Sequence, residues 1–340
     1  MNIKRIGAAV VLLCVFLGAC SGNGQGSAKK MNTADAGSGQ IRIVTTIFPE
    51  YDWVMQILGD NPANANVTML LDQGVDLHSY QPTMEDIVRV SGCDLFIYVG
   101  GESDVWVEDA LKEAINPNLR TINLLEVLGS DAREEEEVEG MQCEEDAHEE
   151  TDGHDHDGEE TEYDEHVWLS LRSASKFCTA IEEAIASIDP DHANTYQQNL
   201  TTYLDQLQAL DMQYSETVDA SASKTLLFGD RFPFRYLTDD YGLTYYAAFS
   251  GCSAETEASF ETILFLAGKV DELSLPAVLI IDGSDGKIAQ TIVENTKAHD
   301  AKILTLDSMQ SVSGKDVEAG TRYLSIMEEN LSVLREALNK

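Results

Sequence analysis

Residues 192–218 read HANTYQQNLTTYLDQLQALDMQYSETV and contain neither proline nor glycine. Apolar side chains recur along this stretch in steps of four and three, at Tyr196, Leu200, Tyr203, Leu207, Leu210 and Tyr214. This spacing places them on one face of a helix, which we interpret as a face packed against the core. Asp189-Pro190-Asp191 supplies a start signal just upstream. The stretch therefore predicts one long helix in the second half of the chain.

Short apolar strands alternate with helical patterns on both sides of this helix. Before it, strand-like runs occupy residues 41–46, 67–71 and 94–99, between helical patterns at 51–58, 83–90 and 106–115. After it, strand-like runs at 226–228, 245–249, 277–281 and 302–306 alternate with helical patterns at 260–273, 288–297 and 321–338. This rhythm is typical of βα units around a parallel sheet. We predict an α/β fold with an N-terminal lobe at 41–187, a linking helix at 188–220 and a C-terminal lobe at 221–340.

The N-terminus predicts export and a lipid anchor. Lys4 and Arg5 precede an apolar run at residues 6–18 that is too short to be an ordinary membrane-spanning helix. The run ends in Leu-Gly-Ala-Cys20, which resembles a bacterial lipobox, and a Gly/Ser-rich linker follows at 21–40. We expect removal of residues 1–20 up to an acylated Cys20, and an extracytoplasmic protein anchored to the bacterial cell membrane. The alternative is a signal without lipid and a cysteine there by chance.

The charge of the chain points to a cation as its ligand. Sixty acidic residues against 22 lysines and arginines give a formal net charge of −38. Such a balance excludes nucleic acid as a partner, because phosphate contacts need basic side chains. A field of this sign attracts cations, although many of the acids serve only solubility.

An acidic segment at residues 131–165 interrupts the first lobe. It has almost no apolar side chains, so we expect it to be disordered without a ligand. It contains His148, His154 and His156, which we predict to be an accessory loop that collects metal. The alternative is a solvated insert without a role.

The cysteines do not form a zinc knuckle. Cys93, Cys143, Cys178 and Cys252 remain after the signal is removed, far apart and without a CxxC pair. An extracytoplasmic setting permits disulfides, and the sequence leaves their pairing open.

Two histidines occupy positions suited to a metal site. His78 lies in GVDLHSYQPT, residues 74–83, in a turn between a predicted strand and a predicted helix. His166 lies in DEHVWL, residues 164–169, where the acidic segment rejoins apolar sequence. Ligands of open α/β sheets bind at the carboxyl ends of strands, and imidazole is the commonest ligand for zinc and similar ions. We predict that both histidines bind metal.

Several motifs agree in order with one protein family. They are VTTIFP (44–49), GVDLHSY (74–80) with PT (82–83), DLF (94–96), WVE (106–108), DEHVW (164–168) and NL at 330–331 with Leu334. The chain from residue 41 to its end resembles the metal-binding lipoproteins of ABC importers for zinc and manganese. The resemblance implies two lobes joined by a rigid long helix, a metal buried in the cleft between them, and His78 and His166 as ligands. It also implies an ABC permease and its ATPase as partners of a monomeric chain.

The second lobe departs from the family pattern. Zinc members present a third histidine in a Phe-His-Asp run, and manganese members a glutamate, whereas residues 228–232 here read FGDRF. Asp230 is the candidate third ligand, with a salt bridge to Arg231 or Arg235 as the alternative. For the fourth position, which usually carries a carboxylate after the strand at 277–281, Asp285 fits best.

Three residues remain as substitutes for these carboxylates. Asp282 is the rival of Asp285, and the loop GCSAETE at 251–257 offers Cys252 and Glu255. Two histidines with two carboxylates suit Zn²⁺, and the harder oxygen ligands also suit Mn²⁺. The histidines of the acidic segment resemble those of zinc-type members, so we predict zinc.

The function that we predict is delivery of zinc to an ABC importer by a high-affinity binding protein that is not an enzyme. A metal-dependent hydrolase is an alternative of a different class, but the sequence lacks HExxH and GxSxG. The sequence also leaves open a manganese-specific binding protein and an adhesin.

Overall fold

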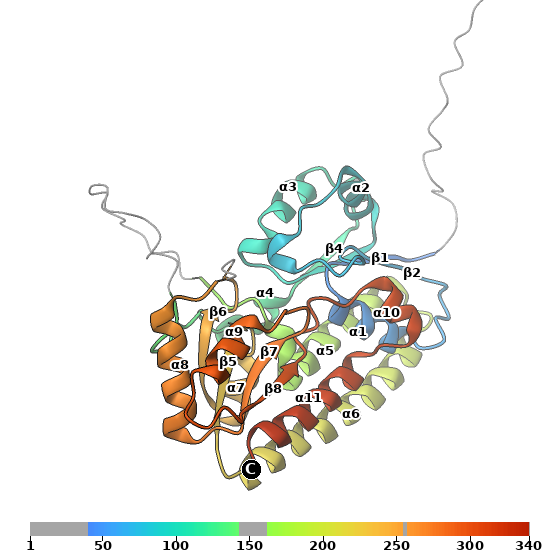
Figure 1. Cartoon of the computed structure of the whole chain (residues 1–340). Coiled ribbons are helices and arrows are strands. Elements are labelled where there is room, and N and C mark those ends of the chain that lie inside the picture. The colour runs from blue at the N-terminus through green and yellow to red at the C-terminus, as the bar shows by residue number, and fades with distance from the viewer. Residues whose placement is uncertain (1–39, 143–161, 254–256, 340) are drawn as a thin grey trace, which may run out of the picture. The chain divides into compact units, whose positions relative to one another are not determined.

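The computed structural model describes residues 40–142, 162–253 and 257–339. Residues Gln40–Lys340 form one compact unit. Its two sheets have four parallel strands each and are flanked by helices (Figure 1). In this part of the chain, the helices are all too short or too polar to cross a membrane.

The two sheets have the same strand order. The first is β2-β1-β3-β4, and the second is β6-β5-β7-β8. Their strands are β1 (Arg42–Thr45), β2 (Asn66–Met69), β3 (Leu95–Tyr98), β4 (Arg120–Asn123), β5 (Thr225–Phe232), β6 (Thr244–Ser250), β7 (Ala277–Ile281) and β8 (Lys302–Leu306). The central strands are nearly continuous apolar runs because helices cover both faces of a parallel sheet. In register, Val44 of β1 lies opposite Thr68 and Phe96 of its neighbours.

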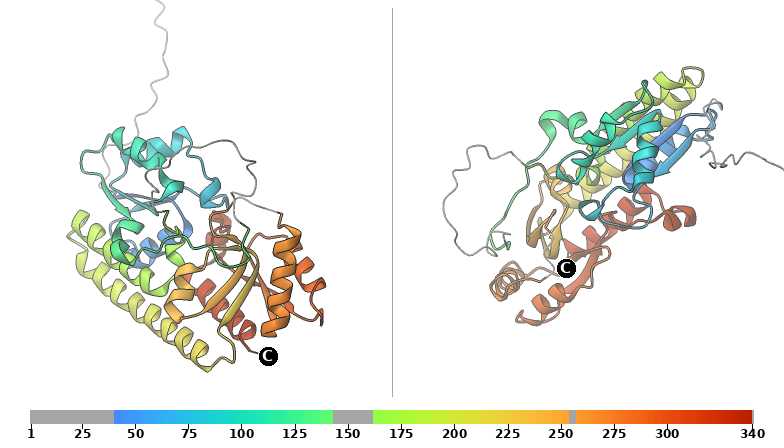
Figure 2. Two further views of the ribbon diagram at one scale, coloured as in Figure 1. Left: turned by 90° about the vertical axis from the view of Figure 1, so that its left-hand side faces the viewer. Right: turned by 90° about the horizontal axis from the view of Figure 1, so that it is seen from above.

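The helices pack on the sheets and on one another. They are α1 (Phe48–Leu58), α2 (Met84–Gly92), α3 (Trp106–Lys112), α4 (Leu124–Leu128), α5 (Leu171–Ile188), α6 (Ala193–Ala220), α7 (Arg235–Tyr241), α8 (Phe260–Leu273), α9 (Lys287–Glu294), α10 (Gly314–Ala319) and α11 (Tyr323–Ala337). Short 3-10 turns include η1 (Leu77–Ser79), η2 (Glu102–Asp104) and η5 (Val167–Leu169). Helices α6 and α11 lie side by side along both lobes (Figure 1, Figure 2).

One hydrophobic core runs through both lobes. It includes Trp53 of α1, which contacts Phe177 of α5 and Tyr323 of α11 with ring centroids 5.6 Å and 5.2 Å away. The apolar face of α6, from Tyr196 to Val218, is buried in the same core. A second, smaller core lies beneath α8 and α9. The continuous core therefore ties the lobes to the long helix.

The structure confirms the α/β fold with two parallel sheets and the long helix. Helix α6 begins and ends within two residues of the predicted 192–218. The bounds of α8, β7 and β8 are the predicted ones. The sequence patterns did not predict β4, α5 and α7. They also placed the start of α1 three residues late, because Pro49 was taken to precede the helix. Proline fits the first turn of a helix, where its missing N–H has no partner to lose.

The prediction of disorder across 131–165 is wrong for its described ends. Glu134 forms an antiparallel bridge with Tyr163, and the Gln142 N–H donates to the Ala248 carbonyl at 3.0 Å. Arg235 of the C-terminal lobe lies 2.9 Å from the Glu136 carboxylate. These ends are held because basic and backbone groups of the second lobe pair with them. The structure does not describe residues 143–161.

Candidate metal site

His78 is held by a capped turn that follows β2. The Asp76 carboxylate accepts from the His78 N–H at 3.0 Å and so caps the 3-10 turn η1. Leu77 anchors the turn because its side chain is buried. The His78 imidazole faces His166, and its side chain is 13% exposed.

His166 is completely buried at the start of η5. The Asp164 carboxylate accepts from its backbone N–H at 2.8 Å and lies 3.0 Å from its Nδ1. The three apolar residues that follow are buried, and the Trp168 indole N–H donates to the Ser308 carbonyl at 2.9 Å. The buried apolar residues of DEHVWL therefore fix the backbone at the histidine, and the Asp164 carboxylate orients its ring.

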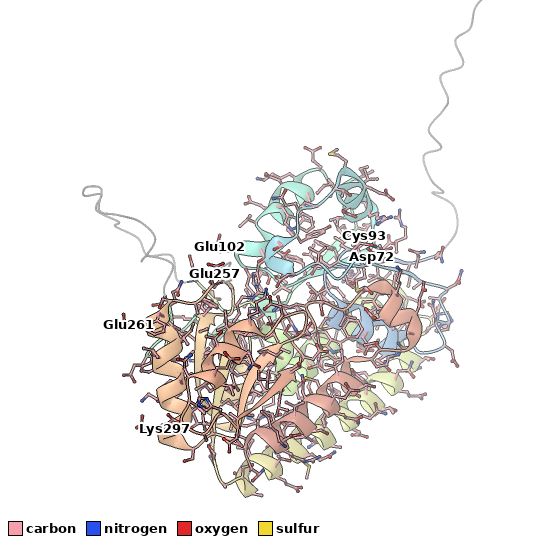
Figure 3. All side chains as sticks on the ribbon, viewed as in Figure 1. Asp72, Cys93, Glu102, Glu257, Glu261 and Lys297 are labelled. Atoms are coloured by element: carbon pink, nitrogen blue, oxygen red, sulfur yellow. The ribbon has the colours of Figure 1, made fainter. Side chains whose placement is uncertain are left out.

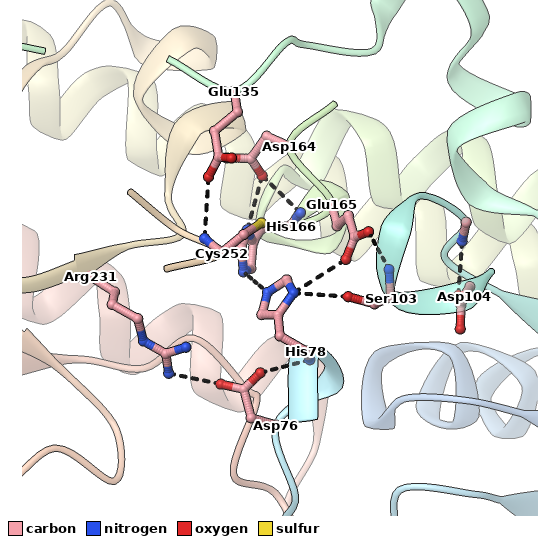
Figure 4. A network of polar contacts seen from close by, with 11 residues as sticks. Asp76, His78, Ser103, Asp104, Glu135, Asp164, Glu165, His166, Arg231 and Cys252 are labelled. Atoms are coloured by element: carbon pink, nitrogen blue, oxygen red, sulfur yellow. Dashed lines mark hydrogen bonds and ion pairs between the residues drawn. The ribbon is translucent and has the colours of Figure 1, made fainter. Parts of the chain in front are cut away.

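The two imidazoles face each other through their Nε2 atoms, 3.1 Å apart (Figure 4). The Asp164 carboxylate lies beside His166 Nδ1, and a proton held there would leave the Nε2 lone pair to bind a metal. Two nitrogens bound to one tetrahedral zinc at about 2.0–2.1 Å lie roughly 3.3 Å apart. The pair thus fits a single cation between its nitrogens.

A second carboxylate lies behind His78. The Glu165 carboxylate is 3.4 Å from His78 Nδ1, and the Ser103 hydroxyl is 2.9 Å from the same nitrogen. Burial alone would lower the pKa of His78, but Glu165 and Asp76 raise it. Gly101 allows this approach, because its φ is +80° and an added Cβ would lie 2.3 Å from Glu165. Both histidines are therefore backed by carboxylates, as the histidine ligands of metal sites usually are.

Two buried carboxyl groups near His78, those of Asp104 and Glu165, have pKa values shifted in opposite directions. Burial, with the nearby Glu165, raises the pKa of Asp104 to about 7. Burial also opposes ionisation of Glu165, but its contacts with His78 and Ser103 lower its pKa below the ordinary value. The negative charge is thus concentrated on the carboxylate that touches the histidine.

Cys252 is the third potential ligand that the fold brings to the histidines. One ligand atom from each of His78, His166 and Cys252 lies within 4.8 Å of the others. Cys252 follows β6, and its backbone N–H donates to Glu135 at 3.2 Å (Figure 4). Burial, together with Glu135 and Asp164, raises the pKa of its thiol. The structure thus groups this thiol with the two imidazoles.

The structure does not bring Asp230 or Asp285 into this group. Asp230 lies in a register irregularity of β5, where it accepts from its neighbour Arg231 N at 2.9 Å and from Ile281 N at 3.4 Å. Asp285 is exposed and pairs with Lys287. Asp230 and Asp285 therefore stay predictions as ligands, without a contact to either histidine among those described.

The rivals of these carboxylates have other neighbours or lie outside the described residues. Asp282 accepts from the backbone and hydroxyl groups of Ser308 and from those of Ser311, so it holds the loop after β8. Glu255, the accessory residues His148, His154 and His156, and Cys20 lie outside the described residues.

A salt bridge joins the lobes beside the histidines. The Arg231 guanidinium of β5 lies 2.8 Å from Asp76, the cap of the His78 turn. Arg231, one of the two partners that the alternative interpretation gave to Asp230, therefore pairs with a different carboxylate. Asp76 and Arg231 border a cleft of 580 Å³ lined by segments of both lobes. The Gln310 carboxamide, turned so that its NH₂ donates to Asp76, places its oxygen 3.1 Å from His166 Nε2.

The other described cysteines are remote from this site. Cys93 and Cys178 are buried free thiols, and Cys93 lies within the N-terminal lobe (Figure 3). Cys252 is also a free thiol, so no disulfide joins the cysteines that the structure describes.

Sequence reasoning gave no role to several groups at the site. Asp76, Asp164 and Glu165 stand in the motifs that were quoted for the histidines, so their proximity in sequence was a usable signal. Ser103 is 25 residues from His78, and Gln310 lies much further along the chain. No motif in the sequence around either residue indicates a role at the site.

Comparison with known proteins identifies the family of the chain. The family model described as "Zinc-uptake complex component A periplasmic" matches residues 43–337. The chain belongs to this zinc-uptake component A family. It is 30% identical to the zinc-binding lipoprotein AdcA of Streptococcus pneumoniae serotype 4 over 99% of its own length. The chain spans 62% of the length of that relative.

One further relative and one solved domain match along nearly their whole length. The high-affinity zinc uptake system protein ZnuA of Bacillus subtilis is 28% identical, with 98% of both chains covered. The solved Zn(II)-bound ZnuA-like domain of Streptococcus pneumoniae AdcA is 26% identical, with 89% of this chain and all of that domain covered and a TM-score of 0.67.

Proposed function

We propose that the chain is the extracytoplasmic zinc-binding component of an ABC importer. The observation that carries the proposal is the pair of imidazoles with Nε2 atoms 3.1 Å apart, each with a carboxylate near its Nδ1. Such a pair binds a transition metal through neutral nitrogens and holds both rings in the required orientation. His78 and His166 are the proposed ligands, and zinc is the cargo.

The donors present favour zinc over manganese. Manganese prefers carboxylate, carbonyl and water oxygens, whereas imidazole and thiol groups suit zinc. Asp230 and Asp285, the oxygen ligands that would favour manganese, contact backbone groups or Lys287 instead. The relatives named for zinc uptake support the same choice.

Delivery to a permease and its ATPase follows from the proposed role. The chain would carry zinc as a monomer anchored by lipid on Cys20, outside the cytoplasm, and pass it to the membrane component. Membership of the zinc-uptake component A family supports this assignment. A zinc hydrolase is the alternative of another class, and an adhesin is a third. We favour binding without catalysis, because the described groups around the histidines serve to hold them and no acid–base motif accompanies them.

The test is a competition titration of the purified chain with zinc and with manganese against a chromophoric chelator. We expect one tight zinc site per chain and a preference for zinc over manganese of at least about 100-fold, since the Irving–Williams order and nitrogen ligands favour zinc. Equal affinities, or tighter binding of manganese, would contradict zinc as the cargo. Zinc-dependent turnover of ester or peptide substrates would contradict the binding role.

The acidic segment is proposed to bind further zinc ions weakly. Removing residues 143–161, which include His148, His154 and His156, should lower the number of zinc ions bound per chain and leave the tight site intact. The described ends that contain Glu136 and Gln142 are kept, so the C-terminal lobe retains its contacts. The control replaces the three histidines alone with alanine. An unchanged zinc stoichiometry in both variants would refute the accessory role.

A further inference from the structure

Resting on the proposed zinc function, we propose that the thiolate of Cys252 is the third protein ligand, in the place expected for Asp230. The ligand set would then be two imidazoles from the N-terminal lobe and one sulfur from the C-terminal lobe. The metal would join the two lobes directly, and the soft sulfur would select zinc against manganese.

The position of Cys252 is set by three features of the fold. First, its sulfur belongs to the group of ligand atoms that lie within 4.8 Å of one another. A tetrahedral zinc with nitrogen and sulfur ligands needs separations of roughly 3.3–3.6 Å, so only a small closing movement is required. Second, the Cys252 N–H is fixed by Glu135 at 3.2 Å.

The third feature is the glycine that precedes the cysteine. An added Cβ at Gly251 would lie 2.9 Å from Cε1 of His166 and 2.9 Å from the Phe232 carbonyl oxygen. A residue with a side chain would therefore push the loop away from the imidazole. The close approach of the β6 loop to His166 needs glycine at this point.

A buried cysteine is most often a small apolar residue of the core. Cys93 and Cys178 fit this description, because both are fully buried in the main core. Cys252 differs, because it is only partly buried and lies outside both cores, within 4.8 Å of ligand atoms of two histidines. Two imidazoles with one sulfur are also a ligand set that zinc accepts.

The proposed binding step releases a proton. A cysteine is ordinarily a protonated thiol at neutral pH, and the thiolate is the form that binds metal. As the zinc–sulfur bond forms, the S–H bond breaks and its proton leaves to solvent. No oxidation or reduction takes place.

The deciding experiment uses cobalt as a spectroscopic substitute for zinc in the full chain. We expect a near-ultraviolet thiolate-to-cobalt charge-transfer band in the wild-type chain and in Cys143→Ser, and no such band in Cys252→Ser. Zinc binding by Cys252→Ser should weaken by roughly 100-fold or more, because losing a ligand should cost at least as much as the 10–100-fold of a supporting partner. Asp230→Asn leaves the sulfur in place and tests the alternative ligand: weaker zinc binding in Asp230→Asn with unchanged binding in Cys252→Ser would overturn the thiolate.

Proton release gives an independent readout. Calorimetry in buffers of different ionisation enthalpy should show about one more proton released per zinc by the wild type than by Cys252→Ser. The thiolate proposal is overturned if Cys252→Ser binds zinc as tightly as the wild type and the wild type shows no charge-transfer band. That result would leave the zinc function unchanged. Absence of tight zinc binding in the wild type would overturn both proposals. If the charge-transfer band is lost in Cys143→Ser but kept in Cys252→Ser, the sulfur ligand belongs to Cys143, and the proposal for Cys252 is overturned.

Discussion

Replacing His166 with alanine should weaken zinc binding on the order of 1,000-fold, which corresponds to about 4.1 kcal/mol. The change removes one of two facing nitrogens and leaves the Asp164 carboxylate buried without the imidazole that it orients. His78→Ala should have an effect of similar size, because the other nitrogen of the pair is lost. Competition titration with a zinc chelator measures both.

His192→Ala is the matched control for these variants. His192 also has a carboxylate near its Nδ1, Asp189 at 2.6 Å, but it lies at the start of α6 and outside the group of potential ligands. Its replacement should leave zinc affinity within a factor of about two, because no proposed ligand is lost. Circular dichroism of the three variants checks that each is folded. If folded His166→Ala binds zinc with wild-type affinity, the proposed metal site is wrong.

Trp53→Ala should lower the free energy of unfolding by about 3–5 kcal/mol, which is the usual cost of removing a large buried aromatic side chain. Trp53 is fully buried where α1 meets Phe177 of α5 and Tyr323 of α11. The cavity left there cannot collapse easily, since three helices surround it. Chemical denaturation followed by circular dichroism measures the change.

Phe260→Ala is the control for Trp53→Ala. Phe260 is also a large aromatic residue in a helix, but its side chain is 70% exposed. Its loss should change the free energy of unfolding by less than about 0.5 kcal/mol, as is usual at the surface. A cost for Trp53→Ala that is no larger than that of the control would show that the helix junction contributes little to stability.

Elements with strong local patterns were predictable from the sequence. The period of the apolar residues in α6 and the continuous apolar run of β7 fixed both elements to within two residues. Helix α5 was missed although its buried residues recur at a helical period. Two other missed elements lack such patterns. The β4 strand has one buried side chain in four, and α7 is only seven residues long, so neither carries a clear period.

The histidine half of the site was visible locally, because each histidine stands in a motif with a carboxylate that accepts from its backbone N–H. Asp76 and Asp164 lie two residues before His78 and His166. The choice of ligands in the other half stays a prediction. Asp230 stood in the matching motif of the second lobe, yet its carboxylate accepts from nearby backbone groups, while Cys252 lies beside the histidines.

By itself the sequence determined the class of fold and the long helix and predicted the two histidines, because apolar periods and short motifs depend on neighbouring residues. Only the tertiary structure decided which group of the second lobe meets them. That choice depends on where the carboxyl ends of strands from two sheets converge, on the close packing of Gly251 against His166, and on the pairing of Arg231 with Asp76. These contacts join residues more than 80 positions apart, and no local pattern records such distances.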